Sequence, residues 1–400
     1  MRIITLTGNN EKHHRMKLLY ISTPSFADCD FPLIKELQLK GVDVTYLILL
    51  PPFQLRTTLF DIKRQIGRTG IFSATKYDEL RPYEDYMDMS KVLVANRTGQ
   101  SGYSLSFWKH KYDLYRFIKN GNFDLIHTDV MHSSRLSFIY RMGVKCVQTV
   151  HDPFPHSGET SHRKTATYTN VMKRARYFVL LNNRQKDEFC KMYDIDPNYV
   201  LINRLGVYDN IKTFVHHGQS VKKNNILFFG RISPYKGIEY LCEAMKLVRK
   251  RIPDATLTIA GGGKMYFDIE SYVRTGYIEL QNHYVDMAEL ASLLSACELS
   301  VCPYTDATQS GVIMTSFSLH KPVVATNVGG LGEMIDDGKS GLLVPPKDPD
   351  ALASAIISLL EDRERLNTMS RYICEEYEQG DRSWSAIADI YIGFYKSILE

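Results

Sequence analysis

A short polar loop in the second half of the chain has the residue types that bind an anion through the backbone. Residues 301–330 read as an apolar strand end, a loop, an amphipathic run and a second strand. The start of a helix leaves backbone N–H groups free and carries a partial positive charge, so it attracts phosphate. The loop and helix start that we expect to do this consist of Thr308, Gln309, Ser310, Gly311 and Val312.

A second loop, from Gly230 to Gly237, follows another predicted strand and adds two cations, Arg231 and Lys236. The guanidinium offers a planar fork and the ammonium a point charge, which together suit a diphosphate. Two solvated loop cations would be the better interpretation of this pair alone. Because the polar loop can present N–H groups to the same phosphates, we predict one diphosphate site built from both loops, Gly230 included.

The elements that must position these loops alternate between strands and helices in both halves of the chain. Strands are predicted at 17–21, 42–50, 123–127, 146–150, 177–181, 200–203, 225–230, 255–260, 299–301 and 323–326. Helices are predicted at 31–40, 184–193, 237–251, 287–296, 312–319, 350–360 and 383–399. This alternation predicts an α/β fold of two doubly wound, Rossmann-like domains with a cleft between them, and ligands at the carboxyl ends of the strands.

The predicted domains are residues 16–210 and 225–380, joined by a polar linker at 211–224. Residues 1–15 are predicted to be an amino-terminal extension. The stretch 53–119 is less regular and rich in aromatic and basic residues, most densely at 107–112.

The composition is that of an ordinary globular protein. The 400 residues are 44% hydrophobic and 24% charged, and this length suits two domains. No window approaches the roughly 18 uninterrupted apolar residues of a membrane span, and the amino terminus lacks a secretory pattern. A cytoplasmic protein is therefore expected. The seven cysteines are never spaced as C-x-x-C, so we expect reduced core thiols.

Charge is distributed unevenly between the two halves. Residues 1–210 carry 30 Lys and Arg against 21 Asp and Glu, whereas residues 211–400 carry 19 against 24. A basic first half favours an anionic partner, such as a phosphorylated acceptor or the inner face of the cell membrane; an unevenly charged, solvated surface is an equal alternative. Residues 53–66 could lay one apolar helix face on a membrane, although packing against the first domain is the preferred interpretation. No nucleic acid partner is expected.

Three segments resemble the retaining glycosyltransferases of family four, which have the GT-B fold. They are GRISPYKG at 230–237, IAGGG at 259–263 and KPVVATNVGGLGEMIDDGKSGLLVPPKD at 321–348. The resemblance covers nearly all of residues 145–360. It implies that the second domain binds a nucleotide-diphosphate sugar and that the final helix, within 381–400, crosses back onto the first domain.

By this resemblance, Arg231 and Lys236 contact the diphosphate, and residues 309–312 hold the phosphates at the helix start. His151, after the strand 146–150, would face the donor sugar, with His156 or Glu159 nearer the acceptor. A structural loop is the alternative for all of that loop except His151. Two prolines there break any regular metal-ligand spacing, so no metal is expected.

One departure falls in the polar loop. The two glutamates that most of the family carries, eight positions apart, fall on Ala307 and Thr315 here. Asp306 stands beside the first position, and Thr315 can offer the ribose no more than a hydroxyl. A subgroup with an ATQSGV-like loop is the closer match. The departure leaves the phosphate contacts in place, and these would stabilise the charge on the leaving diphosphate.

These observations predict a retaining hexosyltransferase with His151, Arg231 and Lys236 as catalytic residues and with no cofactor. It would move a sugar from a nucleotide-diphosphate donor to an acceptor hydroxyl, and the resemblance implies a cell-surface polysaccharide or lipid-linked glycan. The alternatives are a sugar-nucleotide epimerase or hydrolase of the same fold, and a non-catalytic sugar-nucleotide-binding subunit. Residues 261–264, GGGK, fit neither a dinucleotide fingerprint nor a P-loop, which argues against an oxidoreductase or a nucleotide triphosphatase.

Overall fold

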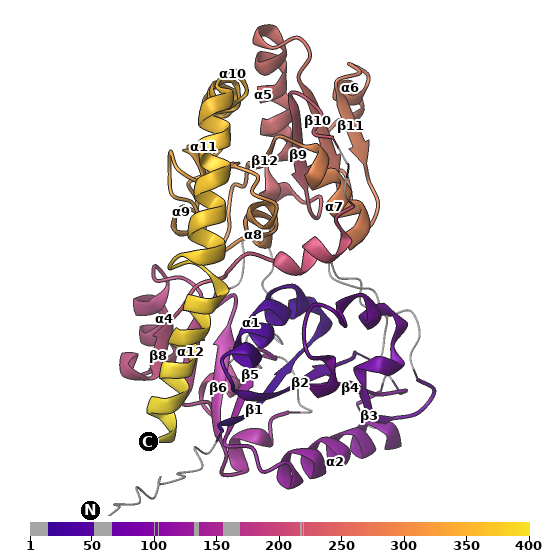
Figure 1. Ribbon diagram of the computed structural model, residues 1–400, viewed down its shortest axis with the longest axis vertical. Helices are drawn as coiled ribbons and strands as arrows, with labels where there is room; N and C mark the ends of the chain where they lie inside the picture. The colour runs from indigo at the N-terminus through magenta and orange to yellow at the C-terminus, as the bar shows by residue number, and fades with distance from the viewer. Residues whose placement is uncertain are drawn as a thin grey trace, which may run out of the picture.

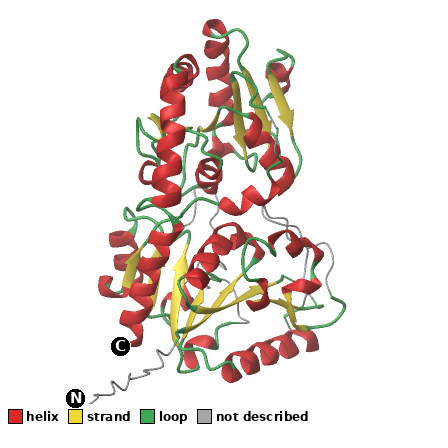
Figure 2. Ribbon diagram, in the orientation of Figure 1, coloured by secondary structure: helices red, strands yellow, loops and turns green. Residues whose placement is uncertain are grey.

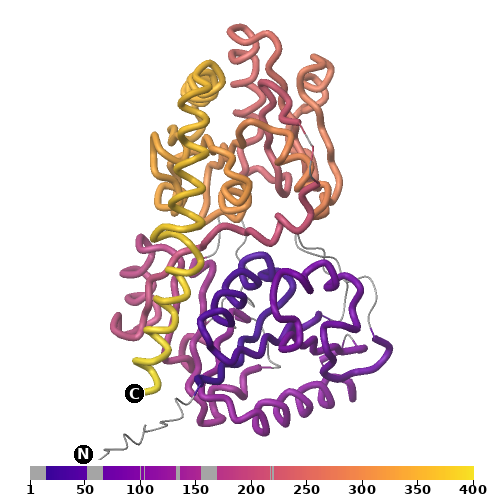
Figure 3. The backbone as a smooth tube through the Cα atoms, viewed as in Figure 1, coloured from indigo at the N-terminus to yellow at the C-terminus, as the bar shows by residue number. Residues whose placement is uncertain are grey.

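The structure is a computed structural model and describes residues 15–51, 66–99, 101–102, 104–131, 136–154, 169–216, 218 and 220–400. The described residues form two lobes stacked along the long axis of the molecule, each built around one sheet (Figures 1 and 2). The chain passes from the first lobe to the second once and then returns, so that its last helix lies beside the first lobe (Figure 3).

The first sheet has eight strands among the described residues, in the order β3-β4-β2-β1-β5-β6-β7-β8. All neighbours are parallel except the edge strand β3, which runs antiparallel to β4. The strands are β1 (Lys17–Ser22), β2 (Asp43–Leu49), β3 (Gly70–Ser73), β4 (Val92–Asn96), β5 (Leu125–Thr128), β6 (Lys145–Val150), β7 (Tyr177–Leu180) and β8 (Val200–Ile202).

The second sheet is parallel throughout its described part and has the order β11-β10-β9-β12-β13-β14. Its central strands are mostly apolar and almost fully buried, as expected for a parallel sheet with helices on both faces. The strands are β9 (Asn225–Phe229), β10 (Thr256–Ala260), β11 (Ile278–Gln281), β12 (Leu299–Cys302), β13 (Val323–Thr326) and β14 (Gly341–Val344).

Helices cover both sheets. Those of the first lobe are α1 (Ala27–Leu39), α2 (Leu105–Asn120) and α4 (Lys186–Tyr193). Those that follow are α5 (Ile238–Arg251), α6 (Glu270–Val273), α7 (Met287–Ala296), α8 (Gly311–Ser318), α9 (Leu331–Met334), α10 (Pro349–Glu361), α11 (Arg363–Cys374) and α12 (Trp384–Leu399). A π-helical turn, Glu375–Gln379, extends α11.

The last helix, α12, leaves the second lobe and lies along the first (Figure 1). It packs against α1, and the Tyr395 hydroxyl forms a hydrogen bond with Nδ1 of the buried His127 on β5. The other ring nitrogen of His127 lies 2.6 Å from the Thr149 hydroxyl on β6. The carboxyl-terminal helix is therefore part of the first lobe's core.

The predicted α/β class is confirmed, and the predicted strands and helices recur within a few residues. The sequence analysis did not predict the short strands β3, β4, β11 and β14, the short helices α6 and α9, or α2, whose exposed side mixes aromatic residues with cations. The strands of the two sheets fall within 16–210 and 225–380, but the exact domain boundaries stay predictions. The start of the predicted linker is packed, because Ile211 is buried in a 3₁₀ turn, Asp209–Phe214.

Two sequence predictions lie outside the described residues: the amino-terminal extension, apart from residue 15, and the amphipathic face at 53–66, apart from residue 66. Among the described helices, none is both long enough and apolar enough to cross a bilayer. All seven cysteines are unpaired, and six of them are buried, as predicted.

Candidate active site at the facing edges of the two sheets

The loop after β9 places Arg231 at the surface and Lys236 in a partly exposed pocket of aromatic rings. The Lys236 ammonium lies 3.6 Å from the centre of the Tyr304 ring and 4.9 Å from that of Tyr235. Among the described residues, no carboxylate is within ion-pair distance of it. Such a cation, held by ring faces alone, is available for an anionic ligand.

The pKa of Lys236 is lowered to about 7. Desolvation is the main cause; the nearby Cys302 thiol opposes it, and the positive charge of Arg231 adds to it. A group with this pKa is partly neutral at physiological pH. A bound diphosphate would restore its charge.

The second loop ends at the start of α8, where Ser310 is the residue before the helix. Its side chain does not cap the helix; the hydroxyl instead donates to the Tyr304 hydroxyl at 3.2 Å. The Ser310 N–H points at the Met334 sulfur, 3.3 Å away, which is a weak acceptor. The first turn of α8 therefore keeps N–H groups that no side-chain cap from Ser310 satisfies.

The two predicted loops lie against each other. A Cβ built on Gly230, whose φ is 122°, would be 3.5 Å from Cγ2 of Val312. On the other side, a Cβ on Gly261 would be 2.0 Å from the Gly230 carbonyl oxygen, so only glycine fits where β10 ends beside β9. The structure thus brings the basic loop and the helix start together, as predicted.

Gln309 connects this region to the first lobe. Its Nε2 donates to the His151 carbonyl oxygen at 3.2 Å, and its buried Oε1 has no hydrogen-bond partner among the described residues. His151 follows β6 at the carboxyl edge of the first sheet, and its ring stacks on Phe26 with centroids 4.0 Å apart. The predicted His151 therefore faces the second lobe's polar loop across the junction of the lobes.

A buried carboxylate that the sequence analysis did not identify lies behind His151. Asp129 directly follows β5, and its Oδ2 lies 3.5 Å from His151 Nε2. Neither oxygen of Asp129 has a hydrogen-bond partner among the described residues. His151 was assigned from the family resemblance, whereas the rule that ligands bind at the carboxyl ends of strands would have pointed to Asp129, because β5 and β6 are neighbours with parallel carboxyl ends.

The buried environment shifts the pKa values of this group. Burial raises the pKa of Asp129 to about 7, because desolvation outweighs the opposing influence of the neighbouring Ser22 and Asp30 side chains. The pKa of Asp30 is also raised, by burial and by the charge of Asp129. Burial lowers the pKa of His151, and the charges of Asp30, Asp152 and Asp28 oppose this. A neutral imidazole facing a carboxyl group is therefore favoured near neutral pH.

The two positions where the family carries glutamates are both buried. Ala307 is 5% exposed and Thr315 is 7% exposed. The Thr315 hydroxyl donates to the Gly311 carbonyl oxygen at 2.8 Å within α8, so its proton is already used. Asp306 is partly exposed. The ribose role of Thr315 and the replacement by Asp306 stay predictions.

A cavity of about 490 Å³ lies next to Gln309 between the lobes, within the size range of small-molecule sites. The first lobe contributes Asn182, Asn203 and Arg204, and the second contributes Gln309 and Glu333, among others.

Glu333 also connects the lobes. Its carboxylate accepts hydrogen bonds from the backbone N–H groups of Asn183, at 3.0 Å, and of Arg184, at 3.2 Å. The Arg184 guanidinium donates to the Gly329 carbonyl oxygen at 2.7 Å. These contacts hold the loop before α4 against the turn before α9.

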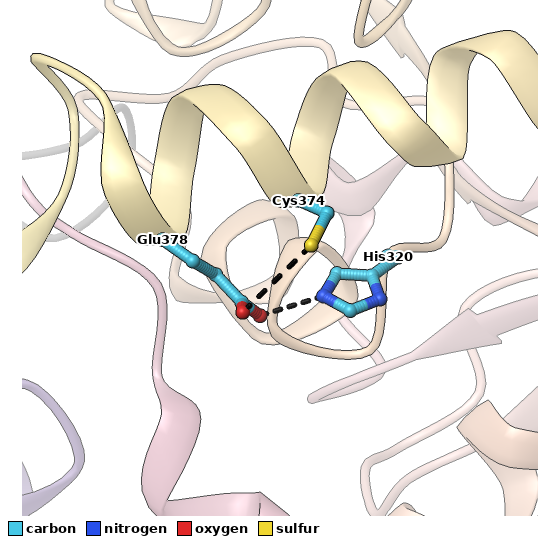
Figure 4. A group of neighbouring side chains, drawn as sticks. All are labelled: His320, Cys374 and Glu378. Carbon is cyan, nitrogen blue, oxygen red and sulfur yellow. Dashed lines mark hydrogen bonds and ion pairs between the residues drawn. The ribbon is translucent and has the colours of Figure 1, made fainter.

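A histidine, a cysteine and a glutamate meet where the chain returns to the first lobe: His320, Cys374 and Glu378 (Figure 4). His320 Nε2 lies 2.6 Å from Glu378 Oε1, and the same oxygen pairs with the Lys212 ammonium. Burial raises the pKa of the Cys374 thiol, which disfavours the thiolate that a metal requires. The Glu378 carboxylate is already paired with the Lys212 ammonium, so we interpret the group as an ion-pair cluster.

The remaining members of the predicted His151 loop, His156 and Glu159, lie outside the described residues. Their predicted place near an acceptor is therefore not addressed by the structure, and the predicted absence of a metal stays a prediction.

Two families match the chain. Residues 33–207 match Glycosyltransferase Family 4, and residues 223–362 match Glycosyl transferases group 1. A glycosyltransferase of Methanocaldococcus jannaschii is 34% identical over 217 residues, which cover 52% of this chain. The match spans 60% of that protein's length, which is less than two thirds. A D-inositol 3-phosphate glycosyltransferase of Paenarthrobacter aurescens is 27% identical over 303 residues, covering 69% of this chain and 73% of that protein.

Solved structures share the fold. HepE of Anabaena in complex with UDP has a TM-score of 0.66 at 16% identity and covers 96% of this chain and 100% of its own. Sucrose-phosphate synthase from Thermosynechococcus elongatus has a TM-score of 0.67 at 17% identity and covers 96% and 99%. At these identities the likeness shows the fold alone, and that fold is the predicted GT-B arrangement of two facing Rossmann-like lobes.

Proposed function

Because the chain belongs to the glycosyltransferases of family four and group 1, we propose that it transfers a sugar from a nucleotide-diphosphate donor to an acceptor hydroxyl. The observation that carries the proposal is the meeting of the Lys236 loop with the start of α8, opposite His151. These groups come from three strand ends and from both lobes. If Arg231 and Lys236 were only solvated surface cations, there would be no reason for these groups to converge.

The proposed donor site uses two kinds of phosphate contact. The Lys236 ammonium and the Arg231 guanidinium supply charge, and the first turn of α8 supplies N–H groups and a helix dipole. Both would strengthen as the glycosidic bond breaks, since negative charge then accumulates on the leaving diphosphate. HepE, which shares the fold, was solved with UDP, and this agrees with such a ligand.

We further propose that transfer retains the anomeric configuration. In the proposed path the leaving diphosphate and the incoming hydroxyl share one face of the sugar, and no protein nucleophile is required. His151 would contact the donor sugar, and Asp129 would hold its ring. A growing cell-surface polysaccharide or a lipid-linked precursor is the proposed acceptor, on the basis of the family resemblance.

The test begins with calorimetry using UDP, GDP and ADP, since the nucleotide that binds defines the donor class. Arg231→Ala and Lys236→Ala should each weaken that binding at least tenfold, because each removes a charge-assisted phosphate contact. Lys250→Ala, at the exposed end of α5, is the matched control. Unchanged binding in both test variants would contradict the proposed diphosphate contacts.

Product analysis then separates transfer from its alternatives. Incubation of the matching nucleotide sugar with acceptor fractions should give a product whose anomeric configuration, measured by NMR, equals that of the donor. Free sugar alone would identify a hydrolase, and a new nucleotide sugar would identify an epimerase. Nucleotide binding without any product would identify a binding subunit, and an inverted product would exclude retention.

A further inference from the structure

The helix α2 exposes an unusual row of large apolar side chains. Leu105 is 89% exposed, Trp108 57%, Tyr112 58% and Tyr115 39%. Steps of three and four residues keep these side chains on one side of an α-helix. The row therefore forms a continuous stripe, which we call the aromatic stripe.

The stripe is not the core-facing side of α2. The helix buries a different set of side chains, which are Phe107, His110, Leu114 and Ile118. With these it packs against β3 and β4. The helix thus has a complete core face and, in addition, an apolar outer face, where an ordinary surface helix would carry polar residues.

Cations accompany the stripe. The Lys111 ammonium lies 5.5 Å from the Trp108 ring centre, and the Arg116 guanidinium lies 5.8 Å from that of Tyr112. Lys119 stands 5.8 Å from the Tyr115 ring. The helix has one acidic residue, Asp113, and it is paired with Lys109. The outer face is therefore both apolar and positively charged.

The position of α2 leaves the candidate active site open. The helix runs along the end of the first lobe that is farthest from the second lobe (Figure 1). A partner on the stripe would not cover the junction where Gln309 meets His151. The stripe is thus a separate surface from the donor site.

We propose that the aromatic stripe of α2 and its cations bind the surface of an anionic lipid bilayer. Trp and Tyr side chains favour the boundary between headgroups and acyl chains, a leucine adds apolar burial, and Lys and Arg attract anionic headgroups. A second copy of the chain is disfavoured, because pairing two stripes would bring the same cations together. Nucleic acid is disfavoured, because Leu105 has no aromatic face on which a base could stack.

The proposal stands independently of the transfer reaction, and intrinsic fluorescence tests it directly. The chain has two tryptophans, and Trp384 is 7% exposed, so a spectral change on adding vesicles reports Trp108. Vesicles containing phosphatidylglycerol should shift the emission to shorter wavelength, and brominated acyl chains should quench it. Phosphatidylcholine vesicles should do neither. Trp108→Phe should abolish the shift, while flotation with the vesicles continues, since Phe preserves most of the apolar area.

Charge reversal provides the second test. Lys111→Glu, Arg116→Glu and Lys119→Glu combined should lower the vesicle partition coefficient by at least ~100-fold, at about fivefold for each cation lost. The matched control reverses three exposed lysines outside α2: Lys191→Glu, Lys223→Glu and Lys250→Glu. Circular dichroism and thermal melting verify that both variants fold.

Three outcomes would overturn the proposal. They are equal binding of the two vesicle types, equal loss of binding in the α2 variant and its control, and no binding of wild-type protein to phosphatidylglycerol. Binding of single-stranded RNA without vesicles would assign the stripe to nucleic acid instead. A mass that doubles with concentration, and that the α2 variant loses, would assign it to a second copy of the chain.

Discussion

The affinity for a nucleoside diphosphate should fall as the pH rises above neutrality, because Lys236 must be charged to bind it. The pKa of Lys236 is lowered from 10.5 to about 7, mainly by desolvation between its aromatic neighbours. A diphosphate beside the ammonium would raise this pKa again. Binding therefore takes up a proton at any pH between the free and the bound pKa.

The size of the effect follows from the free pKa. About half of the Lys236 side chains are charged at about pH 7, and only ~1% at about pH 9. If the bound state stays charged over this range, the dissociation constant rises ~50-fold, or roughly 2.3 kcal/mol. Below about pH 6 the ammonium is already charged, so the constant should level off there.

Calorimetry with the preferred nucleoside diphosphate between about pH 6 and pH 9 measures this dependence. Paired buffers with different ionisation enthalpies should report the uptake of about one proton at pH 8 to 9. Lys236→Met should bind weakly at every pH and lose the proton uptake that is due to Lys236. Any proton exchange that remains in this variant comes from ionisation of the ligand. Lys250→Met is the control at an exposed position. A pH dependence that is equal in the wild type and in Lys236→Met would refute the reasoning.

Three further variants test other parts of the site. The pKa of Asp129 in the folded protein, about 7, exceeds its ordinary 3.8, so the folded protein holds more protons than the unfolded chain and loses stability as the pH rises between these values. Asp129→Asn should reduce this loss of stability in melting curves between pH 4 and 8. A loss as steep as in the wild type would contradict the prediction. Glu333→Gln weakens two hydrogen bonds between the lobes. It should therefore lower the free energy of unfolding in denaturant by about 1 kcal/mol and increase the radius of gyration in X-ray scattering. Unchanged scattering would show that other contacts hold the lobes together. Thr315→Glu should tighten nucleotide binding about tenfold relative to Thr315→Leu if only the ribose contact is missing, and weaker binding would mean that the site is built differently.

The sequence alone identified the residues that the fold brings together in the second lobe. Arg231, Lys236 and Ser310 lie on loops between strands and helices, and the carboxyl ends of parallel strands share one edge. Their convergence therefore follows from local pattern and sheet topology, and the structure agrees. His151 was assigned through the family resemblance, and its place after β6 fits that assignment. The phosphate role of Gln309 stays a prediction, and its amide contacts the His151 carbonyl oxygen.

Other features required the tertiary structure because their meaning depends on what surrounds them. Asp129 is an ordinary polar residue in the sequence. Only burial beside Asp30 and His151 makes it a carboxyl with a raised pKa and with no hydrogen-bond partner among the described residues. The dense aromatic and basic run at 107–112 predicted no element, since packing against β3 and β4 decides which side of α2 is core. The periodicity of the sequence thus determined the sheets and their loops. The pKa shifts of Lys236 and Asp129 and the exposure of Trp108 depend on contacts with distant segments of the chain, so only the tertiary structure decided them.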